Sequence, residues 1–299
     1  MFKKAIKKNL NYTRPLFTGE RLFNDTRVMS GISSFIILND EGYLLTCKHV
    51  AEKVVQAHEL EDKYREYLKE IDGNTVKELK ELEKKYSYND DSLVQVRNVF
   101  MNCFENGFLE QIIFHNNYDL AVIKFSKFTN VNTKVFPTFT DKDIEPGESI
   151  CKLGFPWPMY DCFSFNAKTN EVEVNDNGSF ETPAFPFDGM ITRLVRDENG
   201  NEFAFETSTP GLKGQSGGPV FDVDGNVLGI QSATTSLDLM FDIDTNVIRN
   251  NKEVHAEEKQ FINLGIVISS KVIMKFLDDN NIKYNKKWYL IYHFLFTFI

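Results

Sequence analysis

The stretch from Gly211 to Ser232, GLKGQSGGPVFDVDGNVLGIQS, places Ser216 between glycines and continues into strand-like residues. Glycine adopts backbone conformations that other residues rarely reach, so this segment can bend sharply and turn its N–H groups inward. A serine hydroxyl attacks a carbonyl when a base removes its proton and N–H donors hold the oxyanion. We therefore interpret Ser216 as a candidate nucleophile, with the N–H groups of Gly214 and Ser216 as a candidate oxyanion hole. The alternative is an ordinary glycine-rich loop.

A serine nucleophile needs a base, and the chain has five histidines. His49 follows the apolar run LLTC, which predicts a strand, and the end of a strand is a rigid place from which to present a side chain. Asp119 opens the apolar run LAVIKF and is the candidate carboxylate that orients the histidine. Each of these residues, taken alone, would more often have a structural role.

The composition favours a globular β protein and excludes several other classes. Hydrophobic residues make up 42% of the 299 residues, and the 27 phenylalanines favour strands. The net charge of −9 argues against a nucleic-acid partner, because phosphate binding needs a basic surface. No Cys-x-x-Cys pair and no histidine–carboxylate metal spacing occurs, so we expect no cofactor and no metal. The four cysteines predict free thiols in a reducing compartment.

The pattern along the chain predicts many short strands and one helical insertion. Residues 31–50 read as strand, turn and strand, whereas residues 52–88 are densely charged, with apolar residues at helical spacing. The strand pattern returns near residue 92, and residues 159–188 read as a loop. A serine cap and apolar spacing predict a closing helix over 269–281. This many short strands with turn signals favour a sandwich or barrels.

Three motifs occur in a fixed order: TCKHV at 46–50, DLAVIK at 119–124 and GQSGGP at 214–219. Together they resemble the trypsin-like, chymotrypsin-fold serine peptidases, whose catalytic residues occur in the order His, Asp, Ser. Further stretches are similar to the HtrA-like branch of that family, namely GISSFIILNDEGYLLTCKHV, ESICKLGFPWP, GMITRL and LGIVISSKVI. The resemblance extends from about Ser30 to Leu277.

The resemblance implies an all-β fold of two Greek-key antiparallel β-barrels, with a helical hairpin insertion and a C-terminal helix. The expected units are an N-terminal barrel over 15–136 with the inserted hairpin 52–88, a linker at 137–148, a C-terminal barrel and closing helix over 149–285, and an apolar tail at 286–299. The short stretch after the helix leaves no room for a PDZ module in this sequence, so we expect a protease domain without one.

The resemblance also implies a mechanism. Ser216 would attack a peptide carbonyl, His49 would act as general base and then general acid, and Asp119 would hold the imidazole. Gly214 and Ser216 would form the oxyanion hole, and Ser232 matches the family serine that hydrogen-bonds the aspartate. An ordinary strand serine is the alternative for Ser232.

The substrate pocket is expected beside the nucleophile. The residues expected to wall it are Pro210, Leu212, Lys213, Ala233, Thr234 and Ile266. No acid occupies the position that selects arginine or lysine, so we expect an apolar side chain at P1, the substrate residue before the scissile bond. The neutral Gln215 precedes the nucleophile where digestive members have an aspartate that pairs with a new N-terminus. We therefore expect no activating cleavage of that kind.

The expected partner is a protein or peptide substrate, and nucleic acid is not expected. The basic N-terminal segment has apolar Phe2, Ile6 and Leu10 at helical spacing, and the tail WYLIYHFLFTFI is almost wholly apolar. Both termini are candidates for contact with a membrane surface, and local packing is the alternative. The hairpin 52–88 is a candidate site for a protein partner. No secretory signal is recognisable, which predicts a cytoplasmic protein with peripheral membrane association as a further option.

Three functions fit these features. The first is a serine endopeptidase with an intact catalytic set. The second is a non-catalytic or latent protease-fold binding module, in which the hairpin 52–88 or the loop 159–188 covers the cleft. The third is an esterase or acyl-transfer enzyme that uses the same nucleophile, which only substrate tests separate from a peptidase.

Overall fold

The computed structural model describes residues 1–71, 75–130, 133–156, 162–175 and 182–287. Its helices are α1 (Lys3–Asn9), α2 (Lys48–Ile71), α3 (Val76–Tyr86) and α4 (Ser270–Asp279). The first-half strands are β1 (Thr13–Leu22), β2 (Met29–Ile37), β3 (Tyr43–Thr46), β4 (Leu93–Phe100), β5 (Phe104–Phe114) and β6 (Ala121–Asn130). The remaining strands are β7 (Thr138–Thr140), β8 (Ser149–Gly154), β9 (Phe163–Asn166), β10 (Glu171–Val174), β11 (Phe185–Arg196), β12 (Glu202–Thr207), β13 (Pro219–Phe221), β14 (Val227–Arg249), β15 (Lys252–Ser269) and β16 (Asn285–Lys287).

The first half of the chain forms a six-stranded antiparallel sheet with the order β4-β1-β2-β3-β6-β5. Its two edge strands, β4 and β5, follow each other in the chain through a short turn, so the sheet curls toward a barrel. Phe35, Ile37, Leu44 and Val122 are fully buried within it. Ile36 and Leu45, which alternate with these residues along β2 and β3, are fully buried as well, so both faces of these strands are covered.

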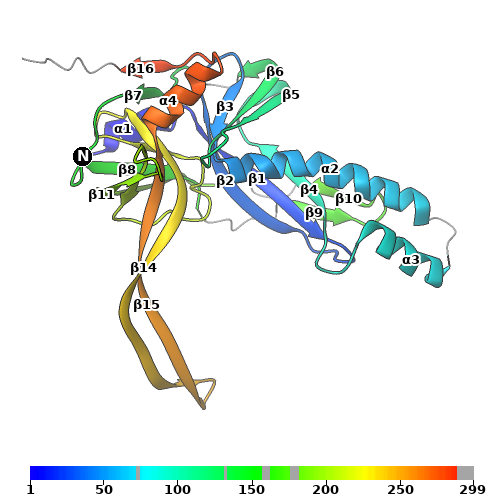
Figure 1. Cartoon of the computed structure of the whole chain (residues 1–299). Coiled ribbons are helices and arrows are strands. Elements are labelled where there is room, and N and C mark those ends of the chain that lie inside the picture. The colour runs from blue at the N-terminus through cyan, green and yellow to red at the C-terminus, as the bar shows by residue number, and fades with distance from the viewer. Residues whose placement is uncertain (72–74, 131–132, 157–161, 176–181, 288–299) are drawn as a thin grey trace, which may run out of the picture.

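The second half closes into a barrel. Strands β13, β8, β11, β12, β15 and β14 pair in that order, and a further pairing of β13 with β14 completes the ring. These pairings are antiparallel. The all-β fold of two antiparallel barrels with a helical insertion and a C-terminal helix is thereby confirmed, and Figure 1 shows α4 at the end of the second barrel.

The helical insertion is present but begins earlier than expected. Helix α2 starts at Lys48 rather than near residue 52, directly after β3. Its residues Tyr64 and Tyr67 pack with Phe23 and Tyr88 in an aromatic cluster against β4. The hairpin therefore lies against the first barrel through one apolar face, and its charged faces meet solvent (Figure 1).

Three connecting or terminal segments contain more structure than the sequence indicated. The expected linker 137–148 contains β7, which pairs in parallel with β14 and β16. The expected loop 159–188 contains the hairpin of β9 and β10, because FSFN and EVEV alternate in polarity across a short turn. The N-terminal segment before residue 15 belongs to the fold: Phe2 and Ala5 of the α1 region pack against Cys151, Leu153 and Phe221 of the second barrel.

Strands β14 and β15 continue past the barrel as a long two-stranded arm, seen at the bottom of Figure 1. The sequence predicted only the barrel ends of these strands. Within the described residues, no helix is both long and apolar enough to span a membrane. The apolar tail lies almost wholly beyond the described residues, and so does the membrane contact expected of it.

Candidate active site

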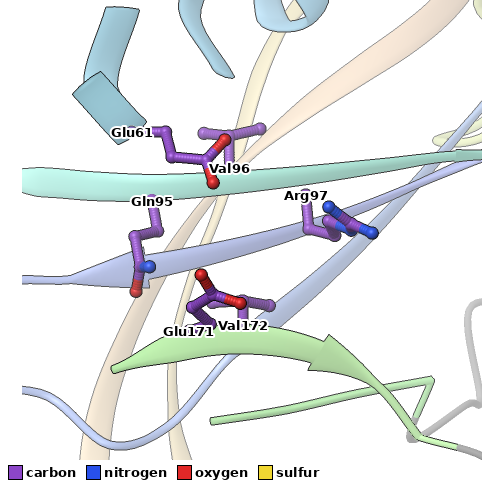
Figure 2. A pocket seen from close by; sticks show the side chains of 6 residues that line it. All are labelled: Glu61, Gln95, Val96, Arg97, Glu171 and Val172. Atoms are coloured by element: carbon purple, nitrogen blue, oxygen red, sulfur yellow. The ribbon is translucent and has the colours of Figure 1, made fainter. Parts of the chain in front are cut away.

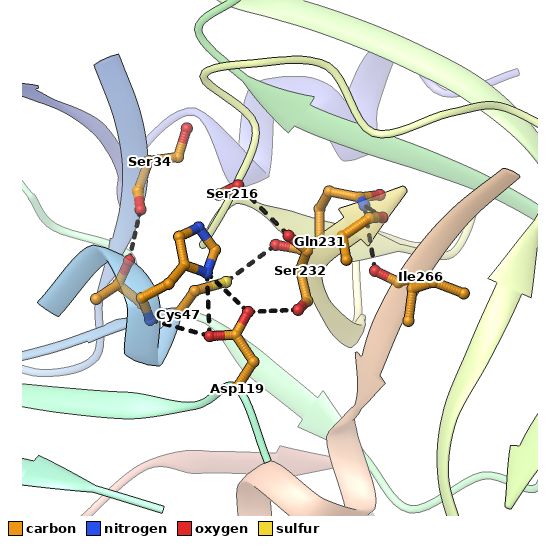
Figure 3. A network of polar contacts seen from close by, with 10 residues as sticks. Ser34, Cys47, Asp119, Ser216, Gln231, Ser232 and Ile266 are labelled. Carbon is orange, nitrogen blue, oxygen red and sulfur yellow. Dashed lines mark hydrogen bonds and ion pairs between the residues drawn. The ribbon is translucent and has the colours of Figure 1, made fainter. Parts of the chain in front are cut away.

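The three candidate catalytic residues come from three separate elements, and Figure 3 shows Asp119 and Ser216 on the two sides of Ser232. His49 is the second residue of α2, Asp119 lies just before β6, and Ser216 lies in the turn that leads into β13. The expected position of His49 at a strand end was wrong by a few residues. Strand β3 ends at Thr46, and the helix that begins at Lys48 carries the imidazole.

Asp119 holds His49 by its backbone and by its ring. Asp119 Oδ1 accepts a hydrogen bond from the His49 N–H at 3.0 Å, and Asp119 Oδ2 lies 2.9 Å from His49 Nδ1. A carboxylate at this distance favours the tautomer with the proton on Nδ1, which leaves Nε2 free to accept a proton. The pair therefore has the arrangement that a general base requires.

The carboxyl group of Asp119 is kept ionised. Burial acts to raise its pKa, but hydrogen bonds from the His49 ring, the Ser232 hydroxyl and the His49 backbone outweigh burial and lower the pKa to about 2. Ionised Asp119 can therefore stabilise the imidazolium that forms during catalysis.

This depressed pKa predicts a pH-dependent contribution to stability. Because the folded-state pKa of Asp119 is about 2 and the ordinary value is 3.8, the ionised carboxylate stabilises the fold above pH 3.8, by about 2 kcal/mol. This stabilisation is lost as the pH falls through 2. We expect the difference in unfolding free energy between wild type and Asp119→Asn to be constant from pH 5 to 7 and to shrink below pH 4. Urea titrations at each pH measure it, and a difference that does not change with pH would contradict the assignment.

Ser232 supports the aspartate from the other side. Its Oγ donates a hydrogen bond to Asp119 Oδ2 at 2.5 Å, as the family resemblance implied. Ser232 is buried on β14, so water does not readily replace the hydroxyl.

Removing this hydroxyl should therefore weaken catalysis moderately. A hydrogen bond to a charged group contributes about 1.5–3 kcal/mol, so we expect Ser232→Ala to lower kcat/KM about tenfold or more. The matched control is Ser236→Ala, since the Ser236 hydroxyl donates to Asn263 on the exposed arm. Steady-state kinetics of both variants measure this effect. Equal values of kcat/KM in the two variants would show that the Ser232 hydroxyl does not support catalysis.

The loop before Ser216 is shaped to expose two N–H groups. Gly214 has a φ of +96°, and a Cβ there would collide with the carbonyl of Phe155. The Gly214 carbonyl accepts hydrogen bonds from Ser34 Oγ at 2.6 Å and from Phe155 N–H at 3.2 Å. Within the described part of the chain, the N–H groups of Gly214 and Ser216 donate to no protein acceptor. They are therefore free to bind a developing oxyanion.

Gln215 holds this loop from inside. Its side chain is fully buried, and Oε1 accepts a hydrogen bond from the Leu212 N–H at 3.0 Å, while Nε2 has no partner. The N-terminal segment does not take part in this contact, because it packs on the outside of the second barrel through Phe2 and Phe221. The neutral side chain of Gln215 therefore holds the loop without an ion pair to an N-terminus.

The Ser216 hydroxyl rests on a backbone acceptor. Its Oγ donates to the Ser232 carbonyl at 3.4 Å, and no hydrogen bond joins it to the His49 ring, although both residues are described. Contacts between a nucleophile and its base are often long before a substrate binds. A rotation about the Cα–Cβ bond of Ser216 would move its hydroxyl from the Ser232 carbonyl toward the His49 ring.

A cleft of about 580 Å³ opens next to His49 and Ser216. It is bounded by β1, β2, the start of α2 and the loop before the nucleophile. Its lining residues are Thr18, Glu20, Met29, Ser30, Gly31, Ile32, Ser33, His49, Val50, Lys53, Lys213, Gly214 and Ser216. This volume is sufficient for a few residues of an extended peptide.

Of the residues predicted to wall a substrate pocket, only Lys213 lines this cleft. The other five lie in three segments: Pro210 and Leu212 in the loop before Ser216, Ala233 and Thr234 on β14, and Ile266 on β15. Thr234 Oγ1 donates to the Gly211 carbonyl at 2.8 Å and accepts from its N–H at 3.0 Å. The pocket assignment therefore stays a prediction, and the apolar P1 side chain expected from it stays one as well.

The sequence interpretation missed Gln231 and Lys152, which lie in the same region. Gln231 Nε2 donates to the carbonyls of Ala233 at 2.6 Å and Ile266 at 3.1 Å, and its Oε1 is buried without a partner. Lys152 Nζ donates to the Thr209 carbonyl at 2.6 Å. Two features of the sequence could have indicated these residues: Gln231 directly precedes Ser232, and Lys152 is a charged residue within an otherwise apolar strand.

Cys47 is the one further group with metal-ligating chemistry beside the triad in the part of the chain that the structure describes. Its Sγ and ligand atoms of His49 and Asp119 lie within 4.8 Å of one another. The thiol is fully buried and donates to the Gln231 carbonyl at 3.2 Å. Burial raises the pKa of Cys47, which disfavours the thiolate that binds metals. Cys47 thus acts as a small core residue, and all four cysteines are buried thiols outside any disulfide.

A separate cavity of about 30 Å³ lies where α2, β4 and β10 meet (Figure 2). It is lined by Glu61, Gln95, Val96, Arg97, Glu171 and Val172, and by none of the candidate catalytic residues. Arg65 bridges Glu61 and Glu171 beside it. Its volume suits about one or two waters, so it belongs to the packing of the hairpin on the first barrel.

No curated protein matches the chain. A solved structure of the HtrA-type protease AlgW with tripeptide is 16% identical, with a TM-score of 0.47, and the match covers 93% of this chain and 63% of that one. Residues 32–230, about two thirds of the chain, match the family model for the trypsin-like peptidase domain. The chain therefore belongs to the trypsin-like peptidase domain family.

Proposed function

We propose that the protein is a serine endopeptidase that hydrolyses peptide bonds through His49, Asp119 and Ser216. The observation that supports this most strongly is the position of Asp119, which accepts hydrogen bonds from both His49 and Ser232. The protein substrate expected from the sequence fits the open cleft next to His49.

In the proposed reaction, His49 Nε2 takes the proton of Ser216 Oγ as that oxygen attacks the carbonyl carbon. The N–H groups of Gly214 and Ser216 bind the oxyanion of the tetrahedral intermediate. His49 then gives its proton to the leaving amine, and the C–N bond breaks to leave an acyl-enzyme. A water, deprotonated by His49, hydrolyses the acyl-enzyme and restores the Ser216 hydroxyl.

The experiment is digestion of an unfolded protein such as casein, with cleavage sites read by mass spectrometry and Ser216→Ala as the blank. Cleavage by the wild type alone supports the proposal. Hydrolysis of a nitrophenyl ester with no cleavage of any peptide would support an esterase or acyl-transfer enzyme instead.

A second candidate is a latent or non-catalytic binding module. The observation that favours it is the Ser216 hydroxyl, which donates to Ser232 rather than to His49. In a latent enzyme, binding of a partner to the hairpin 52–88 or an exposed segment would restore the contact. Deleting residues 52–88 and testing for new activity separates latency from loss of catalysis.

A further inference from the structure

Lys152 of β8 is a buried cation without a carboxylate partner. Its exposed fraction is 0%, whereas lysine is almost never fully buried unless it is paired. Nζ donates to the carbonyls of Thr209 at 2.6 Å and Pro210 at 3.3 Å. An ammonium has three donors, so one remains unused. Burial alone lowers the pKa of Lys152, to about 7, and no acidic group offsets it.

The ammonium lies between the two segments that flank the nucleophile. Thr209 and Pro210 begin the segment that leads to Ser216. On the other side, a Cβ at Gly265 would collide with Lys152 Nζ, and Gly265 pairs with Thr234 two residues after Ser232. Because residue 265 is a glycine and has no side chain, the ammonium group fits beside it.

The same two segments would receive the side chain of the P1 residue. A carbonyl oxygen bound by the N–H groups of Gly214 and Ser216 fixes the acyl group, and the leaving group must point toward His49 and its cleft. The acyl side chain then lies on the opposite side of Ser216, between residues 209–212 and 232–234.

We infer that Lys152 forms the floor of the P1 subsite and selects substrates with glutamate or aspartate before the scissile bond, in place of the apolar side chain expected from the sequence. The inference rests on the proposed peptidase function. An apolar P1 side chain would leave the ammonium desolvated, and a basic one would be repelled by it. A carboxylate pairs with the unused donor, and no acidic residue of the described chain competes for it.

Two side chains of β14 close the subsite. Thr234, which is exposed, covers the solvent side of the subsite through the two hydrogen bonds between its hydroxyl and Gly211. Entry of a side chain requires the Thr234 side chain to rotate, a fast motion for an exposed residue. Gln231, held by Ala233 and Ile266, forms a fixed wall.

The test uses peptides that differ only at P1, with Glu, Gln, Leu and Lys, and the variants Lys152→Met and Lys252→Met. Methionine keeps the length of the lysine stem without its charge. The Thr209 carbonyl that loses the ammonium still accepts hydrogen bonds from Thr207 Oγ1 and the Gly265 N–H. Lys252 is the matched control, since it is an exposed lysine of the arm formed by β14 and β15. Fluorophosphonate labelling of every sample reports the reactive serine independently.

We expect the wild type and Lys252→Met to prefer Glu over Gln, and Lys152→Met to lower the Glu-to-Gln ratio of kcat/KM about 30-fold or more. A merely structural lysine would change both rates equally. A labelled enzyme that prefers Gln, Leu or Lys, or an unchanged ratio in Lys152→Met, overturns the inference while the peptidase function stands. No labelling and no cleavage means that the proposed function has failed, and the inference fails with it.

Discussion

Ser216→Ala is expected to lower kcat by about 10⁶-fold, to the level of the background reaction. Without Oγ there is no atom to attack the carbonyl, and the oxyanion hole alone supports only a small residual rate. The fold should be unaffected, because Oγ makes a single weak hydrogen bond to Ser232 at 3.4 Å. We expect the unfolding free energy to change by less than about 1 kcal/mol.

Active-site titration, peptide kinetics and thermal unfolding of this variant would be compared with Ser236→Ala, which removes a hydroxyl from the exposed arm. The control should keep full activity. If Ser216→Ala cleaved peptides at the wild-type rate, the nucleophile would be another residue.

Asp119→Asn is the second change with a large expected effect, about 10⁴-fold in kcat. The asparagine side chain is neutral. Even when its oxygen accepts a hydrogen bond from His49 Nδ1–H, it does not offset the positive charge of the imidazolium. It also offers an N–H₂ group that stabilises the wrong tautomer of His49. The Ser232 hydroxyl would at the same time lose the carboxylate to which it donates.

Kinetics across pH 5–9 would be compared with Asp197→Asn, which removes a carboxylate from a surface turn that it caps through Asn199 and Asn201. That control should keep its rate. A loss of tenfold or less in Asp119→Asn would show that Asp119 does not act on the histidine.

The order of three motifs was enough to predict the fold, and it nominated three residues, of which Asp119 and His49 are hydrogen-bonded and His49 and Ser216 line one cleft. The glycines around Ser216 predicted a sharp turn with inward N–H groups, and the structure has φ values of +96° at Gly214 and +83° at Gly217. Apolar runs in β2, β3 and β6 predicted the strands that lead to His49 and follow Asp119. The turn and the strands are local features, so residues that are adjacent in the sequence are enough to predict them.

Features that depend on distant contacts were not predictable in this way. The first turn of α2 is held by Asp119, 70 residues away in the chain, whose carboxylate accepts a hydrogen bond from the His49 backbone N–H. Strand β7 has only three residues, and it forms because β14 and β16 lie beside it. The role of Lys152 depends on Thr209 and Gly265, which are 57 and 113 residues away in the chain.

The long arm of β14 and β15 is a further feature that the sequence did not reveal. Its polar residues are frequent enough to read as a loop, and its apolar residues, among them Phe241, Ile243 and Phe261, are exposed. A two-stranded ribbon alone is only marginally stable in water. The arm is the part of the fold with the least support from the two barrels.

The most direct test of the central claim is labelling with a fluorophosphonate probe, read by intact mass, with wild type and Ser216→Ala side by side. The probe reacts only with a serine that has both an activating base and an open oxyanion hole. The proposed mechanism predicts one adduct on the wild type, located on Ser216, and none on the variant. A folded wild-type protein that takes up no probe, or an equal adduct on both proteins, would contradict it.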